Sequence, residues 1–482
     1  MGQKKGDGIM SQPMLPFQVF SLESRWLFEE ARRLDASFYA RDVIASRILI
    51  GDIQKHGFRI DRVHDLADDV FWPGRFKRRY VSKDIGEPFL MPSEVIMFLP
   101  KAKKFVVNYP KDVAVKKDWL LITRSGTVGR CLLTTGFLEN HVLSDDLIRI
   151  IPKNVTNVGY LYAYLNTRIG QAFLTKDQYG STVKHIEPHH VAGIPIPRIP
   201  DFERRVSTTI LQAHSLREEA QQLLLRTNEL LYSELGLPEI DEEDVHYFGG
   251  ERGRLIKSFG IKASQLSLRL DASYHSPILR QIDANLSNLR FEKVRLGEVT
   301  ARIFVPSRFK RAYVKASSVG VPFLQGSHIP QIKPMDIRYI WNKTKKLEDV
   351  LIKKDWVLMT RSGTVGRIGI VSKELEGWAA SEHVFRILLN QEVNPAYIAA
   401  FLDSPYGEYQ IKGKIYGAVV DEIGEHDTSL IEEINIVLPA RDIQDKIGNL
   451  FFEAYDKRDK ANRLEDKAVN LLENELRELA QK

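Results

Sequence analysis

Cysteine is almost absent from this chain of 482 residues, in which Cys131 is the only one. A single thiol excludes an internal disulfide framework and a zinc site built from cysteines. It fits a reducing compartment, so we expect a cytoplasmic protein. The chain also has no apolar run near the ~18 residues that a membrane helix needs. No apolar signal core follows the polar first residues, and we expect 1–20 to be a flexible tail.

The motifs of several DNA-dependent and ATP-dependent enzymes are missing as well. No G-x-x-x-x-G-K-[ST] loop occurs, which excludes ATP-driven translocation by this chain. FGGERG at 248–253 lacks the glycine spacing of a methyl-donor turn, and NPAY at 394–397 lacks the second proline of a base-holding tetrad. Capping of a helix by Asn394, with Pro395 at its first position, explains NPAY better. We therefore predict no catalytic residues.

HIEPHH at 185–190 gathers side chains of the kind that bind metals. The corresponding segment of the second half, EIGEHDT at 422–428, keeps one histidine. A polar loop explains the segment better than a metal site does, so we predict no metal.

What the chain does contain is a duplication. Five motifs recur in the same order at an offset of 233 to 237 residues, which chance does not produce. The pairs are RLDASFYA at 33–40 with RLDASYHS at 269–276, RFKRRYV at 75–81 with RFKRAYV at 308–314, GEPFL at 86–90 with GVPFL at 320–324, DWLLITRSGTVGR at 118–130 with DWVLMTRSGTVGR at 355–367, and YLYAYL at 160–165 with YIAAFL at 397–402.

Each half closes with a segment that is nearly free of glycine and proline, 201–235 and 441–480, and we predict a long helix for each. Apolar and small residues follow a 3-4 alternation in both, which is the seam of a coiled coil. In the second helix the positions are Ile447, Leu450, Ala454, Lys457, Ala461, Leu464, Ala468 and Leu471. At ~1.5 Å per residue the helices span roughly 50–60 Å. Matching register favours packing on each other over folding back separately onto their own domains.

These features predict an α+β fold with two pseudo-repeated mixed α/β domains, separated by two long helices in an antiparallel coiled coil. The expected segments are a tail at 1–20, a first domain at 21–200, a central helix at 201–235, a Gly/Pro-containing acidic linker at 236–260, a second domain at 261–440 and a C-terminal helix at 441–482.

Positive charge is concentrated once in each half. Residues 71–117 hold 11 basic and 4 acidic side chains, and residues 304–354 hold 11 basic and 3 acidic ones, although the whole chain carries only +6. Aromatic residues are interspersed with these charged residues, including Trp72, Tyr80, Tyr313 and Trp341. Such a pattern is typical of surfaces that neutralise a phosphate backbone. A merely solvated face is the alternative, and duplication in register argues against it.

The repeated RSGTVGR motif has strand-like residues on both sides and two glycines within it, which predicts a β-hairpin with an unusual turn. Its exposed backbone N–H groups and hydroxyls offer a phosphate contact. The other interpretation is that the motif only shapes the hairpin.

Together, the two domains with R-L-D-A and D-W-x-L-x-T-R-S-G-T-V-G-R motifs, each followed by a long helix, resemble the specificity subunits of type I restriction-modification enzymes over about 21–480. The resemblance implies two target-recognition domains that read a split DNA site, with the helix pair as spacer and as dock for two methyltransferase subunits. It also implies a motor-nuclease partner. The S-adenosylmethionine, ATP and Mg sites would lie in those partners and none in this chain.

Residues that the two domains share are poor candidates for reading two different half-sites, so we assign them to phosphate. The predicted phosphate-binding residues are Arg75, Lys77, Arg78, Tyr80, Arg124, Ser125, Thr127, Arg130, Arg308, Lys310, Arg311, Tyr313, Arg361, Ser362, Thr364 and Arg367. Base readers are expected where the halves diverge, at 93–110 against 327–344 and at 176–190 against 413–428. Gln178, Lys184 and His185 are the side chains chosen there.

Two other functions stay open. A recognition subunit of a methylase–nuclease fusion would carry the same features. A coiled-coil interaction scaffold without DNA specificity would carry the helices, with the basic segments incidental to its function.

Overall fold

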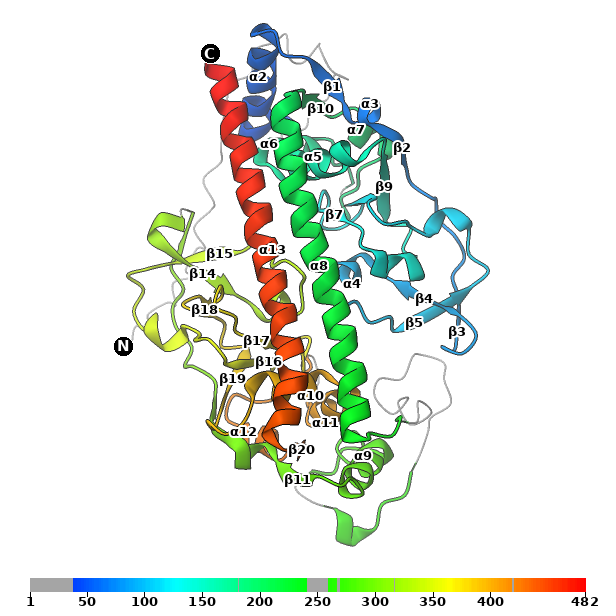
Figure 1. Ribbon diagram of the computed structural model, residues 1–482, viewed down its shortest axis with the longest axis vertical. Coiled ribbons are helices and arrows are strands. Elements are labelled where there is room, and N and C mark those ends of the chain that lie inside the picture. The colour runs from blue at the N-terminus through cyan, green and yellow to red at the C-terminus, as the bar shows by residue number, and fades with distance from the viewer. Residues whose placement is uncertain (1–37, 181, 241–258, 267–268, 316, 418–419) are drawn as a thin grey trace, which may run out of the picture.

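A computed structural model describes residues 38–240, 259–266, 269–315, 317–417 and 420–482, apart from residue 181. The predicted tail at 1–20 and most of the predicted linker at 236–260 lie outside the described residues. Two mixed domains lie on either side of a long pair of helices (Figure 1).

The first domain is built from short strands and helices in the following order: α2 (Arg41–Lys55), β1 (Ile60–Arg62), α3 (Val63–Leu66), β2 (Ala67–Phe71), β3 (Arg79–Val81), β4 (Glu87–Leu90), α4 (Pro92–Val95), β5 (Lys104–Val107), β6 (Leu120–Thr123), β7 (Cys131–Leu133), β8 (Val142–Leu143), β9 (Leu147–Pro152), α5 (Val155–Asn166), α6 (Arg168–Lys176), α7 (Pro188–Ala192) and β10 (Pro195–Pro197).

The second domain repeats this order: α9 (Pro277–Ser287), β11 (Glu292–Arg295), β12 (Thr300–Phe304), β13 (Tyr313–Val314), β14 (Gly320–Leu324), β15 (Arg338–Trp341), β16 (Val357–Thr360), β17 (Ile368–Ile370), β18 (Ala379–Ala380), β19 (Val384–Leu389), α10 (Pro395–Asp403), α11 (Pro405–Gly413), α12 (Thr428–Glu432) and β20 (Asn435–Leu438).

The sheets of the two domains correspond strand for strand. The order β2-β9-β6-β7 in the first domain matches β12-β19-β16-β17 in the second, and β3-β5-β4-β8 matches β13-β15-β14-β18. A small antiparallel pair closes each domain, β1 with β10 and β11 with β20. The duplication seen in the sequence is therefore a duplication of the fold, and the predicted mixed fold class is confirmed.

The long helices are α8 (Pro200–Leu235) and α13 (Arg441–Gln481). The two helices run antiparallel, as three ion pairs between them show: further along α13, the partner lies earlier in α8. Lys446 pairs with Glu234, Lys457 with Glu219, and Arg217 with Glu465. A proline in the first turn of α8 and a left-handed Gly236 after its last residue mark its two ends.

Each helix leaves its own domain and ends in the core of the other. The far half of α8 joins the core of the second domain through Leu224, Leu231 and Leu235, and the far half of α13 joins that of the first through Leu472 and Leu476. The predicted alanines of the seam, Ala454, Ala461 and Ala468, are buried between the helices and the domains. Leu471 is 39% exposed, so the prediction that it belongs to the seam is wrong, and Leu472 lies inside instead. The buried face of each long helix therefore contacts the domains as well as the partner helix.

The domains also touch each other directly. Phe98 N–H donates to the carbonyl of Pro330 at 2.7 Å, and Ile332 N–H donates to that of Ile96 at 3.0 Å. These form an antiparallel bridge in which Met97 faces Gln331, which is its own counterpart in the repeat. A pseudo-twofold axis therefore passes between these loops, and the whole chain approximates a two-fold dimer within one polypeptide.

Candidate nucleic-acid interface

The RSGTVGR motif is a hairpin turn in both domains, between β6 and β7 and between β16 and β17. Gly126 and Gly129 have φ of 74° and 88°, and Gly363 and Gly366 have φ of 74° and 82°. Residues other than glycine rarely adopt these positive φ angles, which explains why glycine occupies both positions of each motif. Thr127 and Thr364 are exposed on the two turns.

Arg124 and Arg361, the first residues of the two motifs, are turned inward. Arg361 is 2% exposed, with Nε donating to the Glu382 carbonyl at 2.9 Å and Nη1 to the Ile423 carbonyl at 3.0 Å. Arg124 pairs with Glu187 at 2.6 Å and stacks on Trp72. Their prediction as phosphate ligands is not supported, because both side chains are buried and terminal nitrogens of each bind the loop that follows α6 or α11. They attach those loops to the hairpins.

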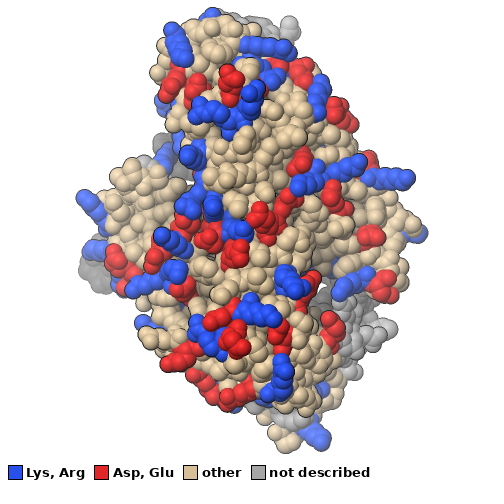
Figure 2. Space-filling model, viewed as in Figure 1, with Lys and Arg blue, Asp and Glu red and all other residues tan. Residues whose placement is uncertain are grey.

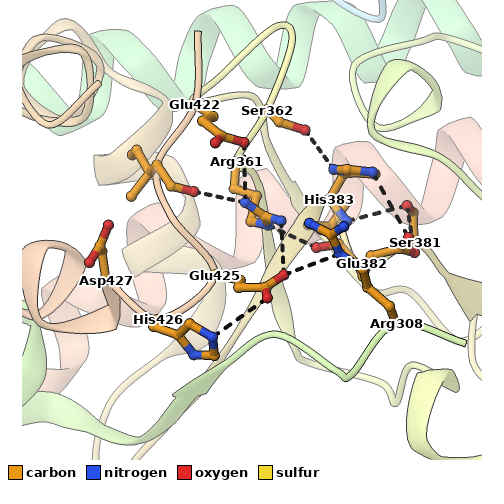
Figure 3. A network of polar contacts seen from close by, with 12 residues as sticks. Arg308, Arg361, Ser362, Ser381, Glu382, His383, Glu422, Glu425, His426 and Asp427 are labelled. Carbon is orange, nitrogen blue, oxygen red and sulfur yellow. Dashed lines mark hydrogen bonds and ion pairs between the residues drawn. The ribbon is translucent and has the colours of Figure 1, made fainter. Parts of the chain in front are cut away.

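Figure 3 shows this attachment in the second domain. Arg361 reaches Glu425 at 3.4 Å and Glu422 at 3.7 Å, while Glu425 also contacts Arg308 at 3.6 Å and His426 at 3.5 Å. Arg308 is 73% exposed, so it links this network to the surface.

The serine beside each buried arginine contacts a histidine, but from different positions. Ser125 Oγ lies 2.8 Å from His185 Nδ1 and 3.0 Å from the Asp146 carboxylate. Ser362 Oγ lies 2.7 Å from His383 Nδ1, and His383 is the repeat counterpart of Asp146. Glu422 takes the place of His185, forming the same backbone bridge to its serine. The acid and the histidine have thus exchanged places, and the two loops present different chemistry on equivalent backbones.

Arg78 and Arg311 are also anchored within the protein. Arg78 pairs with Asp145 at 2.5 Å, and Arg311 reaches both oxygens of Glu382 at 2.6 Å. Burial alone would raise the pKa of Glu382, but Arg311 outweighs burial and lowers it. These two arginines hold the RFKR segments against the domains, which leaves the neighbouring cations for solvent.

The exposed cations and aromatic rings lie on or just before the first strands of the sheets β3-β5-β4-β8 and β13-β15-β14-β18. Arg75, Lys77 and Lys310 are exposed, while Tyr80 and Tyr313 are 43% and 42% exposed. A cation covers each ring, Lys104 at 4.7 Å from the Tyr80 centroid and Arg338 at 5.3 Å from that of Tyr313. These residues form matched basic–aromatic surfaces on the two domains. On the helix-bearing face, by contrast, positive and negative side chains intermingle (Figure 2).

The arginines that end the two hairpin motifs lie in different surroundings. Arg130 pairs with Asp336 of the second domain at 2.6 Å, so it lies at the contact between the domains. Its counterpart Arg367 is half-buried.

Of the segments expected to read bases, some lie at the contact between the domains and others lie partly at the surface. In 93–110 and 327–344, the tips at 96–98 and 330–332 lie in the contact between the domains, so these tips are removed from any open surface. In 176–190, Lys184 is exposed, and Gln178 and His185 are half-buried. His185 is held by Ser125 and by its backbone bridge to Tyr179.

Sequence reasoning missed the most deeply buried cations, Arg149 and Arg386. Both are 0% exposed, in β9 and β19, and their guanidinium groups donate to backbone carbonyls. Burial lowers the pKa of Arg149 to about 10 and that of Arg386 to about 9. A signal was available, since both arginines interrupt apolar strands at equivalent positions.

Within the part of the chain that the structure describes, no cluster of three or more histidine, cysteine, aspartate or glutamate residues is placed to hold a metal ion. No helix among the described residues is both long and apolar enough to cross a membrane.

No family model and no curated protein matches this chain. Solved structures do. The S subunit of a type I restriction-modification system from M. genitalium is 13% identical with a TM-score of 0.33, and covers 88% of this chain and 96% of its own. The HsdS subunit from Thermoanaerobacter tengcongensis is 14% identical with a TM-score of 0.27, over 88% of this chain and 96% of its own. The type IIG restriction endonuclease BpuSI is 12% identical with a TM-score of 0.27, over 39% of this chain and 30% of its own. At these TM-scores the likeness does not by itself assign a family.

Proposed function

We propose that this chain is a non-catalytic, cytoplasmic DNA-recognition subunit of a type I restriction-modification complex, in which each domain reads one half of a split target. The observation that carries the proposal is the pair of matched basic–aromatic surfaces, one on each of the two domains that lie on either side of the long helix pair. Exposed cations neutralise phosphates, and exposed rings beside them suit a nucleic-acid surface better than a purely solvated one. The length of the helices would set the unread gap, as dimer spacing does for other DNA-binding proteins.

The shared and divergent residues then take different roles. Arg75, Lys77, Arg308 and Lys310 are assigned to phosphate, because they are exposed and common to both domains. Base reading is assigned to the loops after α6 and α11, where Lys184 and His185 of the first domain correspond to Asp421 and Glu422 of the second. Cationic side chains suit guanine acceptors, and carboxylates suit cytosine amino groups.

The partners follow from the same proposal. Two methyltransferase subunits would dock on the helices and supply S-adenosylmethionine, and a motor-nuclease subunit would supply the ATP and Mg sites. The intermingled charge on the helix-bearing face fits a protein partner better than DNA. The alternative is a recognition subunit of a methylase–nuclease fusion, which would use the same surfaces.

Long-read methylome sequencing of the host, with and without this gene, tests the proposal. We expect deletion to abolish an N6-methyladenine motif that is split by an unspecified gap. An unchanged methylome, with neighbouring methylase genes intact and expressed, would refute DNA recognition and leave the coiled-coil scaffold.

A further inference from the structure

A cavity of about 320 Å³ lies where the first domain, both long helices and the loop 332–336 of the second domain meet. Its apolar wall includes Cys131, Leu132, Leu138 and Met335. The basic–aromatic surfaces contribute nothing to it, so the proposed DNA reading leaves it without a role. A volume of this size accommodates a small organic molecule.

Four polar side chains that line the cavity each keep a buried atom without a hydrogen-bond partner. These atoms are Arg130 Nε, Thr135 Oγ1, Arg217 Nε and Gln221 Oε1. Thr135, Arg217 and Gln221 are 3%, 6% and 3% exposed. Leaving such groups unpaired costs free energy, so a partner in the cavity would be stabilising.

The equivalent place in the second half is filled. The cavity there is only about 10 Å³ and is lined by Gly369, Leu375, Tyr455 and Arg458, which correspond to Leu132, Leu138, His214 and Arg217. Tyr455 packs against Phe98 of the other domain, with ring centroids 5.2 Å apart. The hydroxyl of Ser372, the counterpart of Thr135, is hydrogen-bonded to Asp459.

At two corresponding positions the second half has the larger aromatic side chain in its packing. Phe98 and Tyr455, which pack on each other, correspond to Ile332, which lines the first cavity, and to His214, which reaches Asp118 at 3.4 Å instead. Thr135 is left without a partner, because Glu218, the counterpart of Asp459, accepts from Gly136 N–H and from Lys117 instead. The first half has therefore kept an open, polar-edged cavity at a place that the second half closes.

The charges around the cavity are already balanced. Arg217 pairs with Glu465 at 2.6 Å, Lys333 with Glu465 and Asp466 at 2.6 Å each, and Arg130 with Asp336 at 2.6 Å. Three cations thus face three carboxylates, and a charged guest would add an uncompensated charge.

We propose that this cavity binds an uncharged organic molecule that carries an amide group. Its carbonyl would accept from the Arg217 Nε–H group and the Thr135 hydroxyl, and its N–H would donate to Gln221 Oε1. The apolar remainder would lie against Leu132, Leu138 and Met335. Because the cavity joins both domains and both helices, such a molecule would stabilise their relative placement.

Saturation-transfer NMR on the full chain tests this with three probes of one shape, namely benzamide, benzoate and benzamidine. We expect benzamide to bind and the two charged probes to bind at least fivefold more weakly. Thr135→Val should weaken benzamide roughly fivefold, the effect of one lost hydrogen bond. It should not lower the thermal midpoint, because the hydroxyl has no partner in the free chain.

Thr344→Val is the matched control, since Thr344 also has a buried hydroxyl without a partner but does not line the cavity. It should leave benzamide affinity unchanged. The proposal is wrong if benzamide does not bind, if benzoate or benzamidine binds as tightly, or if the two variants affect benzamide equally.

Discussion

At the scale of single residues, the arginines of this chain divide into those that build the domains and those that face solvent. Arg149 and Arg386 each collect several carbonyls at the end of a central strand, where no water is available to replace them. A planar fork of N–H donors suits several acceptors at once, which an ammonium group cannot match. Arg124 and Arg361 serve the neighbouring loops in the same way. Sequence reasoning overlooked Arg149 and Arg386 and assigned Arg124 and Arg361 to phosphate, although both are buried, because charge alone does not indicate burial.

Arg386→Lys is therefore expected to destabilise the chain by about 3 kcal/mol, since several buried carbonyls lose their donors and a charge stays buried. Urea unfolding measures the loss. Arg295→Lys, on an exposed strand position, should change the free energy of unfolding by less than ~0.5 kcal/mol. Equal midpoints for the two variants would contradict the structural role of Arg386.

The buried carboxylate of Glu465 makes the free energy of unfolding depend on pH in the acid range. Burial works to raise its pKa, but Arg217 and Lys333 prevail and hold the pKa at about 2, below the ordinary 4.5. A lowered pKa in the folded state gives stability that is complete above pH 4.5 and is lost as the pH falls toward 2. A shift of this size corresponds to about 3 kcal/mol.

Unfolding free energies of the wild type and of Glu465→Gln, measured from pH 7 down to pH 2, check this expectation. The variant should be less stable at pH 7, and the difference should shrink through the window from 4.5 to 2. A difference that does not change with pH would show that the Glu465 carboxylate is not held ionised.

At the scale of secondary-structure elements, the helix pair is more than a spacer. Because each long helix ends inside the core of the opposite domain, its inward face must fit both its partner helix and a domain. The 3-4 alternation predicted the helices and their pairing, but not this wider face, which also buries Arg217, Arg458 and Glu465. Alanines at the contact allow the helix axes to approach closely.

Ala461→Leu should overpack this contact, because Ala461 is 0% exposed. We expect a loss of about 1–3 kcal/mol in the free energy of unfolding. Ala45→Leu, on the exposed side of α2, should leave stability nearly unchanged, because Leu is only slightly below Ala as a helix former. If Ala461→Leu is tolerated as well as Ala45→Leu, the helices are not closely packed at this point.

At the scale of the whole molecule, the pseudo-twofold axis relates two surfaces that carry the same cations at equivalent positions. The domains are held together by the long helices, each of which ends in the core of the opposite domain. The bridge between 96–98 and 330–332 and the Arg130–Asp336 pair add direct contacts. If both surfaces bind one duplex, they should contribute separately and similarly to its affinity.

Lys77→Ala and Lys310→Ala are each expected to lower the slope of log affinity against log salt concentration by about 1, and the double variant by about 2. Fluorescence anisotropy with duplex DNA, with partner subunits present where needed, gives the slope. Lys467→Ala, an exposed position on α13, should leave it unchanged. Equal effects of Lys467→Ala and Lys77→Ala would show that the attraction is non-local and that the basic–aromatic surfaces make no phosphate contact.

The sequence by itself determined the duplication, the two long helices, the hairpin turns and the place of the basic segments. Each of these depends on local spacing, glycine conformation or repetition, which are visible along the chain. Only the tertiary structure decided which arginines turn inward, which loop tips meet across the axis, and that a cavity stays open in one half and is filled in the other. Those outcomes depend on side chains from segments far apart, such as Phe98 and Tyr455, whose sizes decide packing only once the fold has brought them together.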